Sequence, residues 1–288
     1  MEHPDANKVL ACVDGSRSTA SVCDHAVWAG QRLQSPLTFL HVIKHVHAEI
    51  KPDLSGSLAL GARENLLNAM VAAEETQGRL LREQGRAVLN AVVQRAIGQG
   101  VERPGMLLCN DRVLSAIRAL ESEARLIVVG KQGQDGDMVE RHVGSHLESL
   151  IRTVQRAVLV APLTFRRPER FLIAYDGRST AGVVVDRVAA SPLLKGLEGR
   201  LLMVSEDRAA AEDTLRGVQQ QLAERGMAVD VLVRSGSVAE TVYNTCQETN
   251  THLLVMGAFG HSGLRRWFVG STTTEMIMRS PIPLLVVR

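Results

Sequence analysis

The chain has 288 residues, of which 45% are hydrophobic and 22% are charged, and its formal net charge is +2. This composition is typical of a globular protein that is long enough for two domains. The sequence contains no basic tail or stripe, so it gives no electrostatic basis for nucleic-acid binding. Every apolar run is too short to cross a bilayer, and we expect no transmembrane segment.

The N-terminal sequence lacks the basic and then apolar segments of a signal peptide, so we expect none. The cysteines form no C-x-x-C pair, which indicates reduced thiols and favours a cytoplasmic location. They are Cys12, Cys23, Cys109 and Cys246. The histidines His41, His45 and His47 cluster after a predicted strand, but no cysteine or carboxylate pattern accompanies them, and we expect no metal site.

In the first part of the chain, apolar runs predict five strands, separated by segments with helical periodicity. The strands are expected at residues 8–13, 37–43, 106–109, 126–129 and 158–161. A long helical pattern covers about residues 66–97, with a break expected near Gly78 or Gly85. Residues 44–65 are mostly polar and carry no strand pattern.

The pattern then repeats, which predicts two similar domains. Asp176-Gly177-Arg178-Ser179-Thr180-Ala181 follows the apolar run 171–175, as Asp14-Gly15-Ser16-Arg17-Ser18-Thr19-Ala20 follows the run 8–13. We expect a first domain over residues 1–162, a linker over 163–169 and a second domain over 170–288. The first domain is longer between its second and third strands, where we expect an extended helix or a helix pair.

Strands that alternate with helices favour an α/β fold in which helices cover both faces of a mainly parallel sheet. The sequence therefore predicts two tandem, open, five-stranded sheets. In such folds, ligands bind beyond the carboxyl ends of the strands, where the strand order reverses.

A glycine-rich loop ends the second copy of the repeat. The apolar run 253–256 leads into Gly257-x2-Gly260-x9-Gly270-Ser271, and a helical pattern with Met276 and Ile277 follows. Glycines let the backbone approach a ligand closely, and a helix N-terminus offers unpaired N–H groups with a partial positive charge. This order of strand, loop and helix favours an anion site, for which phosphate is the usual ligand.

The loop resembles the nucleotide-binding motif of the universal stress protein family. The flanking residues 263–266, Gly-Leu-Arg-Arg, and 281–287, Pro-Ile-Pro-Leu-Leu-Val-Val, are also similar to that family. The resemblance covers essentially the whole chain, twice. It implies the strand order 3-2-1-4-5 in each domain and ATP or ADP as the ligand, with Mg²⁺ as a candidate companion ion.

In the second domain, the resemblance implies that Asp176 meets the adenine or ribose and that backbone groups at Val204 bind the adenine. The expected cofactor-binding residues are Ala174, Tyr175, Asp176, Val204, Gly257, Gly260, Arg265, Gly270, Ser271 and Thr272. Two alternatives stay open: Asp176 is also a common residue of an Asp-Gly turn, and Arg265 can equally face solvent.

The first domain has a less regular loop, Gly130-x2-Gly133-x10-Gly144-Ser145, which also carries three carboxylates at Asp135, Asp137 and Glu140. Carboxylates near a phosphate site oppose anion binding unless a metal ion intervenes. The weaker candidates for cofactor binding here are Asp14, Val42, Gly130, Gly133, Gly144 and Ser145. A retained fold without nucleotide binding is the alternative for this domain.

No general base or nucleophile stands out beside either loop, so we expect no catalytic residue and at most slow, incidental ATP hydrolysis. The favoured function is an ATP-binding regulatory protein of a stress response, in which the two domains pair within the chain and a homodimer is a further candidate assembly. The alternative is a nucleotide-free assembly or lipid-binding module. An adenylating enzyme is less favoured, because its Ser-Gly-Gly-x-Asp-Ser run is missing after Tyr175.

Overall fold

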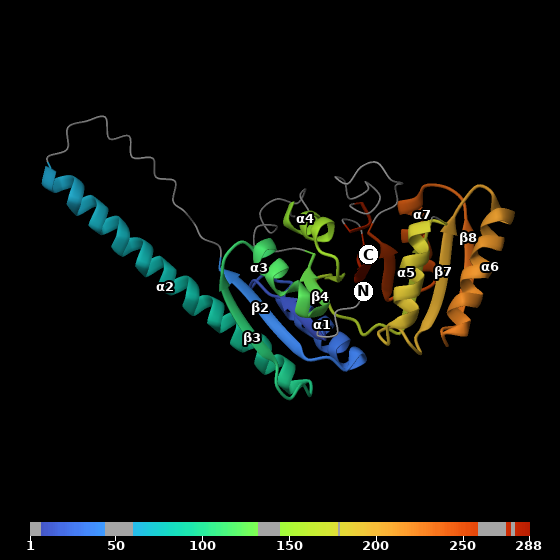
Figure 1. Ribbon diagram of the computed structural model, residues 1–288, viewed down its shortest axis with the longest axis horizontal. Helices are drawn as coiled ribbons and strands as arrows, with labels where there is room; N and C mark the ends of the chain where they lie inside the picture. The colour runs from blue at the N-terminus through green and yellow to red at the C-terminus, as the bar shows by residue number, and fades with distance from the viewer. Residues whose placement is uncertain (1–6, 44–59, 132–144, 178, 259–274, 278–279) are drawn as a thin grey trace.

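The computed structural model of the protein describes residues 7–43, 60–131, 145–177, 179–258, 275–277 and 280–288. Ten strands form one sheet in the order β3-β2-β1-β4-β5-β10-β9-β6-β7-β8. Helices lie on both faces of this sheet, as Figure 1 shows. Two clusters of buried apolar side chains, one of them around Val9 and Phe171 and the other around Leu10 and Leu172, form the core. Neighbouring residues of a strand thus belong to opposite clusters, as the pleat of a buried strand requires.

The first half of the chain contributes the strands β1 to β5 and the helices α1 to α4. The bounds are β1 Lys8–Cys12, α1 Thr19–Leu33, β2 Leu37–Ile43, α2 Leu60–Gly98, β3 Gly105–Asn110, α3 Val113–Leu120, η1 Glu121–Glu123, β4 Ala124–Gly130, α4 Ser145–Thr153 and β5 Ala157–Ala161. The first-half strand order, β3-β2-β1-β4-β5, is the predicted one.

The second half repeats this arrangement. Its elements are β6 Arg170–Tyr175, α5 Ser179–Ala190, β7 Glu198–Val204, α6 Arg208–Glu224, β8 Val229–Arg234, α7 Val238–Glu248, β9 Leu253–Gly257 and β10 Leu284–Val287. The order β8-β7-β6-β9-β10 is again the predicted 3-2-1-4-5 order, so the predicted α/β class and topology are confirmed.

One detail of the predicted architecture needs correction: the two five-stranded sheets are continuous with each other. Strand β5 pairs with β10 in an antiparallel ladder that sets Leu159 opposite Leu285. All four residues of β10 are buried, as are four of the five in β5. An apolar strand with a free edge would leave backbone hydrogen-bonding groups unpaired, and the ladder removes that edge from both halves.

Side chains at the ends of the ladder add further contacts between the halves. Arg288 donates hydrogen bonds of 2.6 Å and 2.8 Å to the carbonyl oxygens of Arg152 and Val154, at the end of α4. Lys131, directly after β4, donates to the carbonyl oxygen of Ser280 at 3.1 Å. A guanidinium at the C-terminus of a helix satisfies carbonyl groups that the helix leaves unpaired.

Helix α2 differs from the prediction, because it runs for 39 residues without the break expected near Gly78 or Gly85. A single glycine costs a helix only about 1 kcal/mol, which continuing hydrogen bonds on both sides can outweigh. Gly85 has a packing role instead. A Cβ atom there would lie 2.8 Å from both His41 Cδ2 and Leu108 Cδ1, so α2 approaches the sheet closely at this residue.

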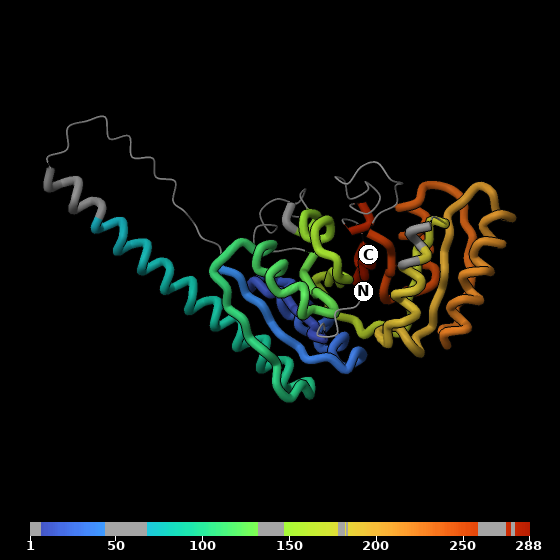
Figure 2. The backbone as a smooth tube through the Cα atoms, in the orientation of Figure 1, coloured from blue at the N-terminus to red at the C-terminus, as the bar shows by residue number. Residues whose placement is uncertain are grey.

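Toward its N-terminal end, the coloured part of α2 in Figure 2 extends away from the sheet. Within the part whose side chains are described, Val71 and Leu80 are about half exposed.

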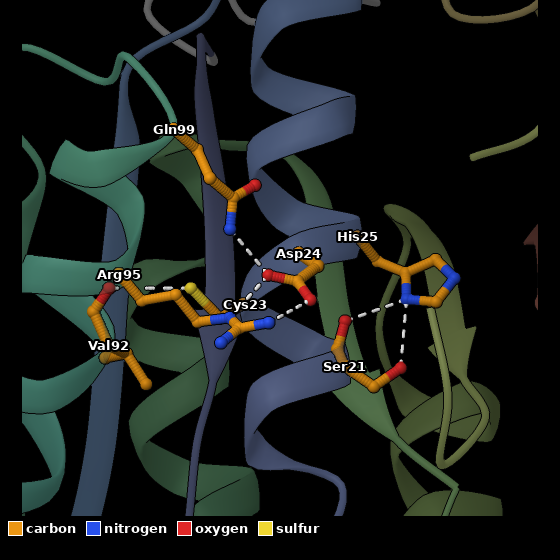
Figure 3. A network of polar contacts seen from close by, with 7 residues as sticks. All are labelled: Ser21, Cys23, Asp24, His25, Val92, Arg95 and Gln99. Atoms are coloured by element: carbon orange, nitrogen blue, oxygen red, sulfur yellow. Dashed lines mark hydrogen bonds and ion pairs between the residues drawn. The ribbon is translucent and has the colours of Figure 1, made fainter. Parts of the chain in front are cut away.

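The C-terminal end of α2 is anchored by a polar network shown in Figure 3. Arg95 donates to both oxygens of Asp24 at 2.6 Å and 2.7 Å, and Gln99 donates to the same carboxylate at 2.6 Å.

We predict that Gly85→Val lowers the free energy of unfolding by about 1–3 kcal/mol, the usual cost of overpacking a close contact. The ring of His41 cannot move aside easily, because its Nδ1 lies 2.8 Å from the carbonyl oxygen of Val13. Gly78→Val is the matched control on the same helix. A Cβ at Gly78 would meet only Arg82, at 3.5 Å, so this change should stay within about 0.5 kcal/mol. Urea denaturation followed by circular dichroism measures both, and equal effects would contradict the packing role.

A second prediction concerns the ion pair between Arg95 and Asp24. Burial raises the pKa of Asp24, but the hydrogen bonds from Arg95 and Gln99 outweigh it, and the net pKa lies below the ordinary 3.8. The resulting stability is present above the pKa of the unfolded carboxyl group and is lost as the pH falls through the lower pKa of the folded state.

Arg95→Met should therefore lower the free energy of unfolding by roughly 1.5–3 kcal/mol at pH 6, the range for hydrogen bonds to a charged group. The difference from the unmodified protein should shrink as the pH falls through the lowered pKa of Asp24 in the folded protein, because this carboxylate then becomes neutral. Arg86→Met, at an exposed site of the same helix, is the control. If Arg95→Met lowered the free energy of unfolding by the same amount at every pH, the arginine side chain would act only by packing.

Candidate functional site

The candidate site in the second half lies at the carboxyl edge of the sheet, where β6 is flanked by β7 on one side and β9 on the other. Tyr175 is opposite Met203 of β7, and Ala174 is opposite Met256 of β9. Asp176 directly follows β6, Val204 is the last residue of β7, and Gly257 is the last residue of β9. These three strands are neighbours where the strand order reverses, which is the switch point of this half.

An Asp-Gly turn connects β6 to α5 at this edge. Asp176 is exposed, and Gly177 has a φ of +73°, a left-handed conformation that favours glycine. A Cβ atom at Gly177 would also lie 2.8 Å from the Cε of Met203. The close approach to Met203 and the positive φ both indicate why glycine follows Asp176 here.

Tyr175 is half-buried between these groups. Burial raises the pKa of its phenol, and the negative charge of Asp176 raises it further. The hydroxyl group therefore stays protonated and can donate a hydrogen bond. Ala174, one residue earlier, is half-buried and packs against the core cluster that contains Leu202 and Leu254.

The rest of the predicted second-half site lies outside the described residues. These candidates are Gly260, Arg265, Gly270, Ser271 and Thr272. On either side of them, β9 ends at Gly257, and residues 275–277 are helical with Met276 and Ile277 buried. The strand before the loop and the helix after it are therefore present, as the sequence predicts.

The first half has the same layout around β1. Cys12 is opposite Leu40 of β2, and Ala11 is opposite Val128 of β4. Asp14 follows β1 by two residues, Val42 lies near the end of β2, and Gly130 is the last residue of β4. Of the other first-half candidates, Gly133 and Gly144 lie outside the described residues, and Ser145 is described only as the first residue of α4.

The carboxylate of Asp14 is engaged within its own turn. Its Oδ1 accepts a hydrogen bond from the backbone N–H of Ser16 at 3.0 Å and lies 3.5 Å from the hydroxyl of Thr19. Thr19 also accepts a hydrogen bond from the N–H of Gly15 at 3.0 Å. These contacts are those of an aspartate that shapes a turn before a helix.

Of the three clustered histidines, the structure describes His41, in β2. The Nδ1 of His41 lies 2.8 Å from the carbonyl oxygen of Val13, while His45 and His47 lie outside the described residues. Among the residues that the structure describes, no group of three histidine, cysteine, aspartate or glutamate side chains is placed to hold a metal ion.

Comparison with known proteins agrees with the repeat and the topology. The model of the family described as "Universal stress protein family" matches residues 6–162 and, separately, residues 168–288. The chain belongs to the universal stress protein family. A tandem universal stress protein has two such segments in one chain, and the two matches correspond to the two halves of the sheet.

A universal stress protein from Synechocystis sp. is 28% identical over 284 residues, which span 97% of this chain and 99% of the relative. A solved universal stress protein from Archaeoglobus fulgidus has a TM-score of 0.68 at 20% identity and covers 98% of this chain and 96% of its own. A putative universal stress protein from Pseudomonas aeruginosa has a TM-score of 0.63 at 15% identity and covers 98% of this chain and 92% of its own. At these identities the solved structures establish the fold alone.

In this universal stress protein, the described part of the chain contains no helix that is both long and apolar enough to cross a membrane.

The described part of the chain also contains a cavity that the sequence did not predict. The cavity lies between α7 and the segment that leads into β10, near Cys246, Leu254 and Ile282. Its residues come from segments far apart in the sequence, so no motif or spacing could have indicated it.

Proposed function

We propose that this universal stress protein binds ATP or ADP at the carboxyl edge of its second half and acts as a nucleotide-dependent regulator in a stress response. The observation that carries the proposal is the combination of two features. The sequence has the regular spacing Gly257-x2-Gly260-x9-Gly270-Ser271, and the described residues Asp176, Val204 and Gly257 follow or end the three neighbouring strands β6, β7 and β9, where the strand order reverses.

These residues and their neighbours suit different parts of an adenine nucleotide. The Asp176 carboxylate can accept hydrogen bonds from ribose hydroxyls or from the base amine. Backbone groups around Val204 can pair with the adenine edge, and the protonated hydroxyl of Tyr175 is a nearby donor. The glycine loop and the helix after it suit the phosphates, and Mg²⁺ can shield their charge.

The second half is the proposed high-affinity half. Its loop carries arginines at positions 265 and 266, whereas the first loop carries Asp135, Asp137 and Glu140. This difference in charge favours anion binding in the second half over the first.

The proposal is for binding and not for catalysis. The candidate residues include an acceptor for the sugar and base, but none is a nucleophile or general base assigned to the γ-phosphate. Hydrolysis, if measured, should be slow. The cytoplasm is the proposed location, as it supplies ATP and keeps the four cysteines reduced.

The proposed assembly has two levels. Within the chain, the two halves pair through β5 and β10, and the contacts of Arg288 and Lys131 support this pairing. A homodimer of the full chain is the second level. Light scattering of the purified protein over a range of concentrations measures its mass and would exclude the homodimer if only the monomer were found.

The first test is the ligand that the protein carries. We expect native mass spectrometry of the purified, undialysed protein to detect ATP or ADP in a ratio of about one per chain. A bound acyl lipid with no nucleotide would instead favour the lipid-binding alternative. An acyl-adenylate product formed on addition of ATP and a carboxylic acid would favour the adenylating enzyme.

The second test compares two matched substitutions in the full-length protein. Asp176→Asn keeps the shape but loses the charge, so ATP affinity should fall by roughly 1–3 kcal/mol, the range for a hydrogen bond to a charged group. Asp14→Asn is the matched control in the first half. It should change the free energy of ATP binding at the higher-affinity site by less than about 0.5 kcal/mol. Isothermal titration calorimetry measures both constants.

Any slow turnover at saturating ATP should persist in Asp176→Asn, because the lost contact is equal in the ground and transition states. A larger effect of Asp14→Asn on affinity would reverse the ranking of the two halves. A collapse of turnover with unchanged affinity would make Asp176 a catalytic residue.

A further inference from the structure

The cavity beside α7 lies at the amino end of β9, whereas the candidate nucleotide residues lie at the carboxyl ends of the strands. Its wall includes Leu254, the second residue of β9, while Gly257 ends that strand. A strand rises about 3.3 Å per residue, so the two positions are roughly 10 Å apart along β9. Among the described candidate nucleotide residues, none lines the cavity.

The inner wall of the cavity is apolar. Leu254, Met276 and Cys246 are buried there, and Ile282 packs against the same core cluster. Burial raises the pKa of the Cys246 thiol to about 12, although a hydrogen bond with Thr251 acts in the opposite direction. The thiol is therefore uncharged and behaves as a small apolar group.

The hydroxyl groups around the cavity already have partners within the protein. Ser280 donates to the carbonyl oxygen of Ile282 at 2.8 Å, and the hydroxyls of Thr251 and Thr249 are 2.8 Å apart. Because an ordered water needs two to four polar partners, this wall is better suited to an apolar group than to water. The cavity volume is ≈ 180 Å³. An engineered apolar cavity of about 150 Å³ in another protein binds benzene, so this one can hold a single small ring or a short branched chain.

The rim carries a positive charge. Arg166, an exposed residue of the linker, lines the cavity, and its guanidinium donates a 3.3 Å hydrogen bond to the side-chain oxygen of Asn250. The pKa of the neighbouring His252 is lowered first by burial and then by the charges of Arg166 and Arg170, against the smaller opposite effects of Glu169 and Glu198. An anionic group at the rim would meet this positive potential.

We propose that this cavity is a binding site for a small apolar carboxylate, such as an aromatic monocarboxylic acid. The hydrocarbon body occupies the space between Cys246, Leu254 and Met276, and the carboxylate pairs with the guanidinium of Arg166. The site is independent of the proposed nucleotide site and does not rest on it.

Sodium benzoate and the neutral benzyl alcohol form a matched pair of probes for this site. Occupancy is measured by NMR of the protein labelled with ¹³C at the methionine methyl groups, in which Met276 reports from inside the cavity. Its resonance is assigned through Met276→Leu. Benzoate should shift the Met276 signal in a saturable manner and bind roughly three- to fivefold more tightly than benzyl alcohol, as expected for a partly exposed ion pair.

Two linker variants test the charge. Arg166→Gln should remove the preference for benzoate over benzyl alcohol, whereas Arg167→Gln, an exposed neighbour outside the cavity wall, should retain it. Cys246→Leu tests the cavity by filling part of it, and benzoate should bind this variant more weakly, provided that its circular dichroism is unchanged.

Three results would overturn the proposal. The first is a Met276 signal that neither probe shifts at the highest soluble concentrations. The second is equal binding of benzoate and benzyl alcohol, or a preference that survives Arg166→Gln, which would remove the role of the arginine. The third is unchanged benzoate binding by a folded Cys246→Leu protein, which would place the ligand elsewhere.

Discussion

The antiparallel ladder between β5 and β10 is the interaction on which the rest of the structure depends. Each half contributes a buried, apolar terminal strand, and neither strand could stay unpaired without exposing backbone groups and hydrophobic side chains. The ladder joins these two edges and runs the strands of the two halves in opposite directions. As a result, the carboxyl end of β4 neighbours the segment that leads into β10, where Lys131 reaches Ser280.

The two ends of β9 differ in chemistry because different segments meet there. At the carboxyl end, Gly257 ends β9 near the exposed Asp176, which follows the neighbouring strand β6. At the amino end, α7, the linker and the segment before β10 enclose apolar side chains beneath the cation of Arg166. The two ends of this strand therefore differ in polarity.

The two halves differ in length between their second and third strands, where α2 has 39 residues and its counterpart α6 has 17. Among its described side chains, α2 is anchored along its C-terminal part, through the close approach at Gly85 and the contact of Arg95 with Asp24. Gly85 lowers the helix propensity but lets the helix approach the sheet, and Arg95 compensates for the burial of the Asp24 carboxylate. These contacts at one end explain how a much longer helix is accommodated without a change in strand order.

The sequence alone determined the fold class and the repeat, because hydrophobic periodicity and the Asp-Gly and glycine-loop patterns are local signals that the chain carries twice. The strand order followed from the resemblance of these motifs to the universal stress protein family. The sequence also predicted a ligand site that includes Asp176, Val204 and Gly257, since parallel strands bring their carboxyl ends to one side of a sheet. Tertiary structure decided the rest. Whether Gly78 or Gly85 breaks a helix depends on what the helix packs against, and a single ten-stranded sheet depends on pairing between residues more than a hundred positions apart, such as Leu159 and Leu285. The cavity near Cys246 likewise arises only when segments distant in sequence pack together, because its physical properties belong to the enclosed space and not to any one segment.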